Sequence, residues 1–421
     1  MRVLFATDAF PPRCGGSGWS TYELARGLRD RGHEIVLVQP RPGRFTTGER
    51  EYDGFRIIEV ASPAPSIPYV RNYFKNEWLW GRLAARLQQV AGEHHADLIH
   101  GQHVLTAPAA VLAGRASGIP VVCTVRDYWP VCYWGTLIYD PEAPGLCPVC
   151  STGMMTQCIR PRAGFAWPAA LAGIPYMRGN LARRQRYLAG ADAVVAVSSV
   201  IGRDLRDRSP ALRAARVEVI PNPVDIAGIR AAAAHTKPPL PGSYAVFVGK
   251  LEINKGAAFL LPAVERARLP WTLAVIGDGA ERARIETAAR RLGRDVRFTG
   301  WLDREHALAW LAHASVLVFP SYGPESLSRV LLEAATLGVP IAAMDTGGTR
   351  DIVEHEVTGL LASTTAGLGD DVGRLVTDRA LAHTLAANAR RRIETRFDSA
   401  IVAAHVEALY ANLVSRKGRR R

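Results

Sequence analysis

The chain has 421 residues, of which 48% are hydrophobic and 22% are charged. This length accommodates two ordinary domains with full cores, and the composition excludes an intrinsically disordered protein. The formal net charge of +13 favours anionic partners: a phosphorylated substrate, an anionic lipid surface or nucleic acid. No run reaches the roughly 18 apolar residues of a membrane span, and residues 2–6 suit a first strand better than a signal peptide. We therefore expect a cytoplasmic protein.

The first half of the chain alternates short apolar runs with helical patterns. The first run leads into a glycine-rich turn at residues 15–18 and then into a helix through Tyr22 and Leu28. Such continuous apolar runs are typical of strands that are covered on both faces, as in a parallel sheet. The predicted strands are 3–6, 35–38, 98–100, 121–125, 193–197 and 217–220.

Residues 163–177 form an uncharged stretch that is interrupted by Pro168, Gly173 and Pro175. The stretch is too short and too broken to cross a membrane. Two interpretations stay open: a segment that lies on a membrane surface, or a pair of buried helices.

The second half repeats the pattern after the stiff Pro-Asn-Pro segment at 221–223. Strands that alternate with helices imply right-handed βαβ units and parallel sheets. We predict an α/β fold of two Rossmann-like parallel-sheet domains facing across a cleft, with an N-terminal domain over 1–220 and a C-terminal domain over 221–398. Ligands of such sheets bind beyond the carboxyl ends of the strands, so the cleft is the expected site. The predicted strands of the second half are 245–248, 273–276, 296–298, 316–319 and 340–343.

Glu325 and Glu333 are separated by seven residues in a segment with helical apolar spacing. This spacing predicts a buried helix that begins just after Gly323 and Pro324. Glu325 then lies at the helix N-terminus, where free amides attract anions, and Glu333 lies about 12 Å further along. One carboxylate could bind the hydroxyls of a sugar and the other those of a ribose, with a diphosphate between them. Two solvated glutamates on an amphipathic helix are the alternative.

Lys250 and Lys255 follow the predicted strand 245–248. Two cations there could neutralise a departing diphosphate without a metal, and solvated surface lysines are the alternative. The chain has no Asp-x-Asp triplet, the usual metal-binding solution for nucleotide-sugar diphosphates. Gly277 indicates a structural turn between strand and helix, and the glycines at 347–348 could bring backbone amides close to an anion.

Four motifs occur in order in the second half: Gly-Lys-x4-Lys-Gly at 249–256, Ile-Gly-Asp-Gly at 276–279, Phe-Pro-Ser-x3-Glu-x7-Glu at 319–333 and Gly-Gly-Thr-Arg-Asp-Ile-Val-Glu at 347–354. In order and spacing they resemble the C-terminal domain of retaining GT-B glycosyltransferases of family 4. The N-terminal half is similar as well. Its matching segments are Phe-Pro-Pro with Gly-Gly at 10–16, Arg-Gly-His-Glu-Ile at 31–35, Asp-Leu-Ile-His at 97–100 and Ile-Pro-Asn-Pro-Val-Asp at 220–225.

The resemblance implies a retaining glycosyltransferase that moves sugar from a UDP- or GDP-sugar, held by the C-terminal domain, to a glycan or lipid-linked acceptor. By analogy, Lys250 and Lys255 stabilise the leaving diphosphate, Glu325 contacts the donor sugar and Glu333 the ribose. The family's final helix returns to the first domain, so that 399–421 would join it. Other residues that would bind the nucleotide sugar are Gly15, Gly16, Gly249, Gly277, Ser326 and Leu327.

In this family, anomeric retention is ascribed to attack on the front face, with the leaving phosphate drawing the acceptor proton. That account needs neither a protein nucleophile nor a cofactor at the catalytic site. Arg126 is a departure, because family members commonly carry a histidine at this position, lining the donor sugar. As a catalytic-site residue, Arg126 could bind the carboxylate of an acidic sugar or an acceptor phosphate. The alternative is an arginine that pairs with Asp127 or points to solvent.

Four cysteines cluster in a Pro- and Gly-rich insertion at about 130–180. Cys147 and Cys150 have the Cys-x2-Cys spacing of a zinc knuckle, and Cys132 and Cys158 would complete four thiolates. We predict a structural zinc site. Another metal or cluster, and free or redox-active thiols, stay open, whereas disulfides are less expected in the cytosol.

Three competing functions stay open. A nucleotide-sugar epimerase or a glycan phosphorylase could share the GT-B fold, but the first needs no acceptor and the second normally holds pyridoxal phosphate on a lysine. The interpretation as a nucleic-acid-binding protein depends on the net charge and on the basic tail at 416–421. No segment resembles a nucleic-acid-reading motif, so we expect no nucleic-acid partner. A basic tail is more typical of a solvated end or of peripheral contact with an anionic membrane.

Overall fold

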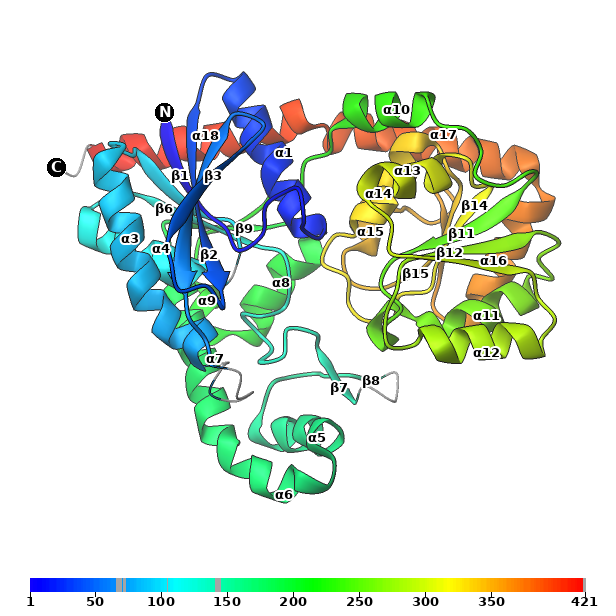
Figure 1. Cartoon of the computed structure of the whole chain (residues 1–421), viewed down its shortest axis with the longest axis horizontal. Coiled ribbons are helices and arrows are strands. Elements are labelled where there is room, and N and C mark those ends of the chain that lie inside the picture. Colours follow the sequence, from blue (N-terminus) through cyan, green and yellow to red (C-terminus); the bar gives the residue numbers. More distant parts are fainter. Residues whose placement is uncertain (66–69, 71–72, 104, 141–144, 419–421) are drawn as a thin grey trace.

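The computed structural model describes residues 1–65, 70, 73–103, 105–140 and 145–418. Two α/β domains lie side by side, and the described chain both begins and ends on the first of them (Figure 1). The last three residues of the basic tail, 419–421, lie outside the described residues. No helix among those described is both long and apolar enough to cross a membrane.

The N-terminal domain is built on an eight-stranded sheet in the order β10-β9-β6-β5-β1-β2-β4-β3. The six predicted strands are all present. β3 and β4 were not predicted. β3 is largely exposed and polar, and in β4 the charges of Arg56 and Glu59 interrupt the apolar run. β3 also pairs antiparallel with β4, against the expectation of a purely parallel sheet. The strands are β1 (Arg2–Ala6), β2 (Glu34–Pro42), β3 (Gly48–Tyr52), β4 (Phe55–Ser62), β5 (Leu98–Gly101), β6 (Val121–Val125), β9 (Ala193–Ala196) and β10 (Val217–Val219).

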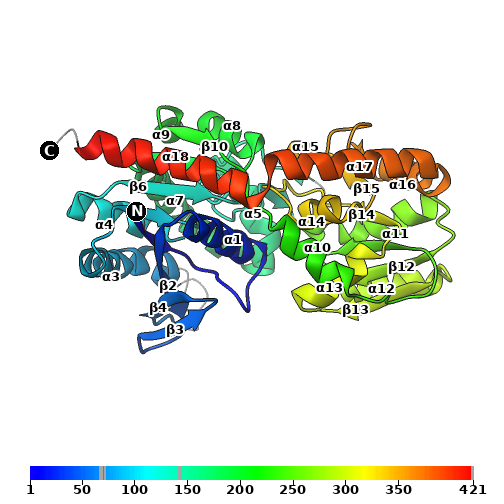
Figure 2. The same cartoon turned by 90° about the horizontal axis from the view of Figure 1, so that it is seen from above.

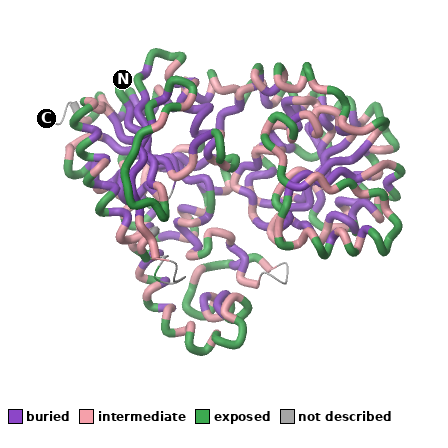
Figure 3. Tube along the Cα trace, viewed as in Figure 1, coloured by how far each residue is buried: buried purple, intermediate pink, exposed green. Residues whose placement is uncertain are grey.

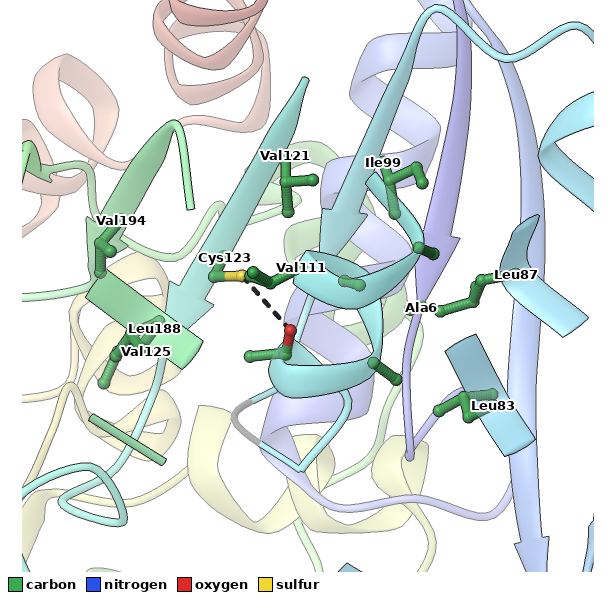
Figure 4. Close-up of a cluster of buried hydrophobic side chains, with 14 of the residues drawn as sticks. Ala6, Leu83, Leu87, Ile99, Val111, Val121, Cys123, Val125, Leu188 and Val194 are labelled. Atoms are coloured by element: carbon green, nitrogen blue, oxygen red, sulfur yellow. Dashed lines mark hydrogen bonds between the residues drawn. The ribbon is translucent and has the colours of Figure 1, made fainter. Parts of the chain in front are cut away.

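Alternate side chains of β1 enter two different cores. Leu4 and Ala6 pack with helices α3 and α4 on one face, where the close-up in Figure 4 shows Ala6 next to Leu83 and Leu87 of α3. Val3 and Phe5 face the other core, which α1 and α18 cover. This alternation follows from the period of two along a strand. The helices of the domain are α1 (Gly16–Asp30), α3 (Leu79–Glu93), α4 (Ala107–Ser117), α7 (Ile174–Ala189), α8 (Ser199–Arg208) and α9 (Pro210–Arg213), with a π-helical turn η1 (Phe74–Trp78).

The C-terminal domain has a six-stranded parallel sheet in the order β13-β12-β11-β14-β15-β16, with hydrophobic cores on both faces. The five predicted strands are present, and the three-residue β16 was missed. The strands are β11 (Tyr244–Val248), β12 (Thr272–Ile276), β13 (Val296–Gly300), β14 (Val316–Phe319), β15 (Ile341–Met344) and β16 (Leu360–Ala362). The helices are α10 (Ile226–Ala234), η4 (Ile253–Lys255), α11 (Ala257–Arg266), α12 (Arg282–Arg291), α13 (Arg304–Ala312), α14 (Arg329–Leu337), α15 (Thr349–Ile352), α16 (Thr365–Thr377) and α17 (Arg379–Arg396).

The chain crosses between the domains twice, and the two crossings pair with each other. Val224 N donates to the Phe397 carbonyl at 2.8 Å, and Ser399 N donates to the Val224 carbonyl at 3.0 Å. Helix α18 (Ser399–Gly418) then runs back along the N-terminal domain, as Figure 2 shows from above. This confirms the predicted return of the final helix. The residue boundaries of the domains stay a prediction.

The Cys-rich insertion forms a hairpin and a helical lobe. The hairpin consists of β7 (Ile138–Asp140) and β8 (Gly145–Leu146). In the uncharged stretch 163–177, only Ile174 and Met177 are buried, and Phe165 is fully exposed. The interpretation of this stretch as a buried helix pair is therefore wrong. The lobe contains α5 (Thr152–Ala163), η2 (Gly164–Ala166), α6 (Trp167–Ala170), η3 (Leu171–Gly173) and the start of α7.

Candidate active site

The helix predicted to begin after Pro324 begins later. Helix α14 starts at Arg329, so Glu325 lies in the preceding loop and not at a helix N-terminus. A tertiary hydrogen bond explains the later start: the Glu325 carbonyl accepts from Gly348 N at 2.6 Å and so does not begin a helix. The same bond occupies one of the amides that were expected to approach an anion.

Glu325, which is buried, forms an ion pair with the partly exposed Lys255. Lys255 Nζ lies 2.7 Å from Glu325 Oε1, and the Ser321 hydroxyl donates to the same oxygen at 2.5 Å. The two residues follow β11 and β14, which are neighbours in the sheet although distant in sequence. The strand order reverses between β11 and β14, and such a switch point is where ligands of open parallel sheets bind. Lys250, from the same loop as Lys255, stays largely exposed and lies 3.5 Å from Glu252.

Glycines allow the loops around this pair to approach one another closely. Gly277 has a φ of 131°, and a Cβ there would lie 2.0 Å from the Gly249 carbonyl oxygen. Gly347 has a φ of 50°, and a Cβ would lie 2.2 Å from the Glu325 carbonyl oxygen. A side chain at either position would push the loops apart. Gly277 and Gly249 therefore position the loop that carries Lys250.

Glu333 belongs to a buried ion cluster that joins the two domains. We call Glu23, Arg304, Arg329 and Glu333 the Glu23 cluster. Glu333 Oε1 lies 3.1 Å from Arg329 Nε and 3.6 Å from Arg304 Nε. Both arginines also bind Glu23 Oε1 on α1, Arg304 at 3.1 Å. Glu333 is therefore not a solvated surface glutamate, and its nearest charges are tied to the opposite domain.

Gly15 and Gly16 lie at the start of α1, beside the same cluster. Gly15 caps the helix, and a Cβ on Gly16 would lie 3.4 Å from Arg329 Cβ. The structure thus brings the predicted glycine loop against the helix that carries Glu333. Ser326 and Leu327 lie in the loop before that helix, with Leu327 buried in the core.

Glu23, Arg304 and Arg329 were not predicted from the sequence as residues of the site. A signal was present for two of them: Glu23 interrupts the apolar side of α1, and Arg329 stands at the start of an apolar helix. A charge in an apolar pattern indicates a buried partner. The partner itself could not be read from the sequence, because it lies in the other domain.

Arg126 is buried and donates three hydrogen bonds to two residues. Its Nε donates to Asn222 Oδ1 at 2.9 Å and its Nη2 to Gln102 Oε1 at 2.9 Å, and its Nη1 donates to the Gln102 carbonyl. The alternative expectation, pairing with Asp127 or solvent exposure, is wrong. Arg126 tethers the Pro-Asn-Pro crossing to the end of β5.

Two histidines of β5 and its following loop have different environments. His100 is fully buried and bonds to Tyr410 of α18 and to Thr124, which fixes it structurally. His103 Nδ1 lies 2.8 Å from Asp8, at the adjacent ends of β5 and β1. The strand order of the first sheet reverses there, as it does at Lys255 in the second. His103 Nε2 is buried without a hydrogen-bond partner among the described residues.

The four cysteines of the insertion are free thiols. Burial, with a smaller contribution from the neighbouring thiols, raises the pKa of Cys150 to about 11 and that of Cys158 to about 12. Within the described part of the chain, no three His, Cys, Asp or Glu side chains are gathered as a metal ion would require. The Cys147 thiol instead donates to the Val149 carbonyl at 3.1 Å. In this arrangement the thiols do not form a zinc site, so zinc binding by Cys132, Cys147, Cys150 and Cys158 stays an untested prediction.

The hairpin of the insertion reaches the C-terminal domain. Ile138 Cδ1 would lie 3.2 Å from a Cβ on Gly323, two residues before Glu325. Arg162 of α5 holds β7 by donating to the carbonyls of Ile138 and Tyr139, each at 2.8 Å. The insertion therefore forms one side of the Lys255–Glu325 loops.

The comparisons with known proteins agree with this geometry. Residues 14–227 match the family described as Glycosyltransferase Family 4, and residues 242–378 match Glycosyl transferases group 1. The chain is 25% identical over 440 residues to a glycogen synthase of Mycobacterium tuberculosis, an alignment that covers 100% of this chain and 96% of the relative. It is 27% identical to a GDP-mannose-dependent alpha-mannosyltransferase of Mycolicibacterium smegmatis, over 86% of this chain and 84% of that one.

Solved structures show the same fold. Sucrose-phosphate synthase of Thermosynechococcus elongatus superposes with a TM-score of 0.72 at 21% identity, over 98% of this chain and 99% of that one. HepE of Anabaena in complex with UDP superposes with a TM-score of 0.64 at 20% identity, over 98% and 100%. The chain therefore belongs to glycosyltransferase family 4, with the GT-B arrangement of two parallel-sheet domains.

Proposed function

We propose that this glycosyltransferase moves a sugar from a UDP- or GDP-sugar to a glycan or lipid-linked acceptor, with retention of anomeric configuration and without a metal at the diphosphate. The Lys255–Glu325 pair at the switch point of the second sheet carries the proposal. The mannosyltransferase relative is GDP-mannose-dependent and HepE has been solved with UDP-glucose, which supports a nucleotide-sugar donor.

The lysines supply the charge that a leaving diphosphate requires. Lys255 has three N–H donors, so it can keep Glu325 and still donate to a phosphate oxygen. Glu325 holds Lys255 in place before the donor binds, so that little reorganisation accompanies bond cleavage. Lys250 is largely exposed on the same loop, where it can exchange its ion pair with Glu252 for a second phosphate oxygen. Positioning and electrostatic stabilisation then account for catalysis.

Glu333 is assigned to the ribose of the donor. Both arginine contacts in the Glu23 cluster are made to its Oε1, so Oε2 is the proposed acceptor for ribose hydroxyls. We propose that the sugar acceptor binds at the corresponding switch point of the first sheet, beside the pair of Asp8 and His103. In the mechanism that the family implies, the leaving phosphate takes the acceptor proton, and no protein nucleophile is needed.

The test is a donor panel measured as nucleoside diphosphate release, with and without acceptor and with a metal chelator. Lys255→Ala should lower turnover by about 10²–10³, the usual loss when one preorganised partner of a developing charge is removed. Glu333→Ala should mainly raise the donor KM, because ribose contacts exist in ground and transition states alike. Lys237→Ala, an exposed lysine in the loop between α10 and β11, is the matched control.

Three outcomes would overturn the proposal: wild-type turnover in Lys255→Ala, loss of activity in chelator, or product with inverted configuration by NMR. Release that does not depend on acceptor, with a changed sugar on the nucleotide, would instead identify an epimerase.

A further inference from the structure

The helical lobe of the insertion, residues 152–181, has a hydrophobic cluster separate from the cores of both domains. Figure 1 shows α5 and α6 projecting away from the two sheets. The lobe has a small core of its own, formed by Met155, Ile159, Ile174, Met177 and Leu181. Because the lobe packs on itself, its outer end is not used to stabilise either domain.

The outer end, which we call the lobe tip, comprises residues 163–173 and is apolar and exposed. Phe165 is 100% exposed, and Figure 3 shows this end of the lobe largely in the exposed and intermediate classes. Ala166, Pro168 and Ala169 beside it are exposed as well. An apolar patch that the chain leaves in water is typical of an interaction site.

The charges around the lobe tip are all positive. Residues 145–191 contain six arginines and no Asp, Glu or Lys. Arg162 and Arg184 are committed to backbone carbonyls, and Arg183 pairs with Glu77. The arginines left exposed are Arg160, Arg178 and Arg186, and the side chain of Arg160 lies over the Trp167 ring at 5.7 Å.

We propose that the lobe tip docks on the surface of an anionic lipid bilayer. Phe165 and its apolar neighbours enter the headgroup layer, and the exposed arginines bind lipid phosphates. Apolar burial and attraction to anionic lipid are the two contributions that hold a peripheral protein at a membrane, and the lobe tip supplies both. No helix among the described residues could span the bilayer, so the contact is with its surface.

The lobe is also coupled to the site, and this step rests on the proposed function. Arg162 of α5 holds the hairpin strand β7, whose Ile138 contacts Gly323 beside the Lys255–Glu325 loops. A lobe docked on a bilayer therefore brings those loops toward the membrane. This favours an acceptor carried on a lipid over a free glycan.

The experiment is sedimentation with vesicles of phosphatidylcholine alone or mixed with phosphatidylglycerol, using the full chain. Wild type should sediment with the anionic vesicles and dissociate as salt is raised. Phe165→Ser should lower the partition coefficient about tenfold, since most of the apolar anchor is lost. Arg160→Glu combined with Arg178→Glu should abolish the preference for anionic vesicles. Because these side chains are exposed, thermal unfolding should stay unchanged.

Phe45→Ser is the matched control, since Phe45 is 84% exposed in the loop between β2 and β3. An equal loss of vesicle binding in Phe45→Ser, or wild type remaining in the supernatant with anionic vesicles, would overturn the proposal. Nucleotide binding, measured without vesicles, separates the two proposals. If the chain binds vesicles through Phe165 but no nucleotide, the docking surface stands and the transferase proposal fails.

Discussion

Replacing Glu23 with Gln tests the ion cluster that joins the domains. The Glu23 side chain is 0% exposed and binds both Arg304 and Arg329, with Asp225 N at 3.3 Å from its second oxygen. Gln keeps the size of the side chain but leaves Glu333 as the one acidic member of the cluster. Breaking a buried ion pair typically costs about 3–5 kcal/mol, because the remaining charge stays buried without compensation. Glu333 compensates part of that charge, so we expect a loss of about 3 kcal/mol in the free energy of unfolding.

The same change should weaken donor binding. Without the Glu23 charge, we expect both arginines to turn to Glu333 and bind more of its carboxylate. The arginines would then compete with the ribose for that carboxylate. We expect the donor KM to rise more than turnover falls, since a ribose contact contributes to ground and transition states alike.

Urea denaturation and donor titration measure the two effects. Asp30→Asn is the control, because Asp30 is exposed at the C-terminal end of the same helix, and surface changes usually stay within about 0.5 kcal/mol. A Glu23→Gln protein with wild-type unfolding and a wild-type donor KM would refute the reasoning.

Three further predictions concern other buried groups. Burial lowers the pKa of His100 well below its ordinary value of 6.5, so below pH 6.5 the unfolded state binds more protons than the folded state. The free energy of unfolding should therefore fall as the pH is lowered, by up to about 1.4 kcal/mol per pH unit. His100→Gln should flatten this slope in urea titrations between about pH 5 and 7, and an unchanged slope would contradict the prediction. Arg126→His should leave the Gln102 carbonyl and Asn222 without their donor and lower stability with no change of donor preference; a new donor preference at unchanged stability would argue for direct substrate contact. If the insertion binds zinc, metal analysis should find about one zinc per chain and Cys147→Ser should lose it, whereas four titratable thiols in metal-free protein of unchanged melting temperature would exclude the site.

The sequence by itself determined the fold and the order of the motifs. Apolar strand runs alternating with helical patterns are local signals, and eleven of these strands were predicted and found. The strands that were missed are short, polar or interrupted by charge, as in β3, β16 and β4, where the period of two is too weak to detect. Lys255 and Glu325 were named from their motifs, but their pairing depends on β11 and β14 being neighbours in the sheet.

Tertiary structure decided what each charge does. The apolar spacing predicted that residues 325–328 would be helical. The Gly348 amide instead donates to the Glu325 carbonyl, and the helix begins at Arg329. Arg126 is committed to the domain crossing, and Glu333 is held by arginines that α1 binds from the other domain. The local sequence pattern shows which face of a helix or strand is buried, because the apolar residues of that face recur at a regular spacing along the chain. The partner of a buried charge comes from a distant segment, and only the packing of the two domains brings it within reach.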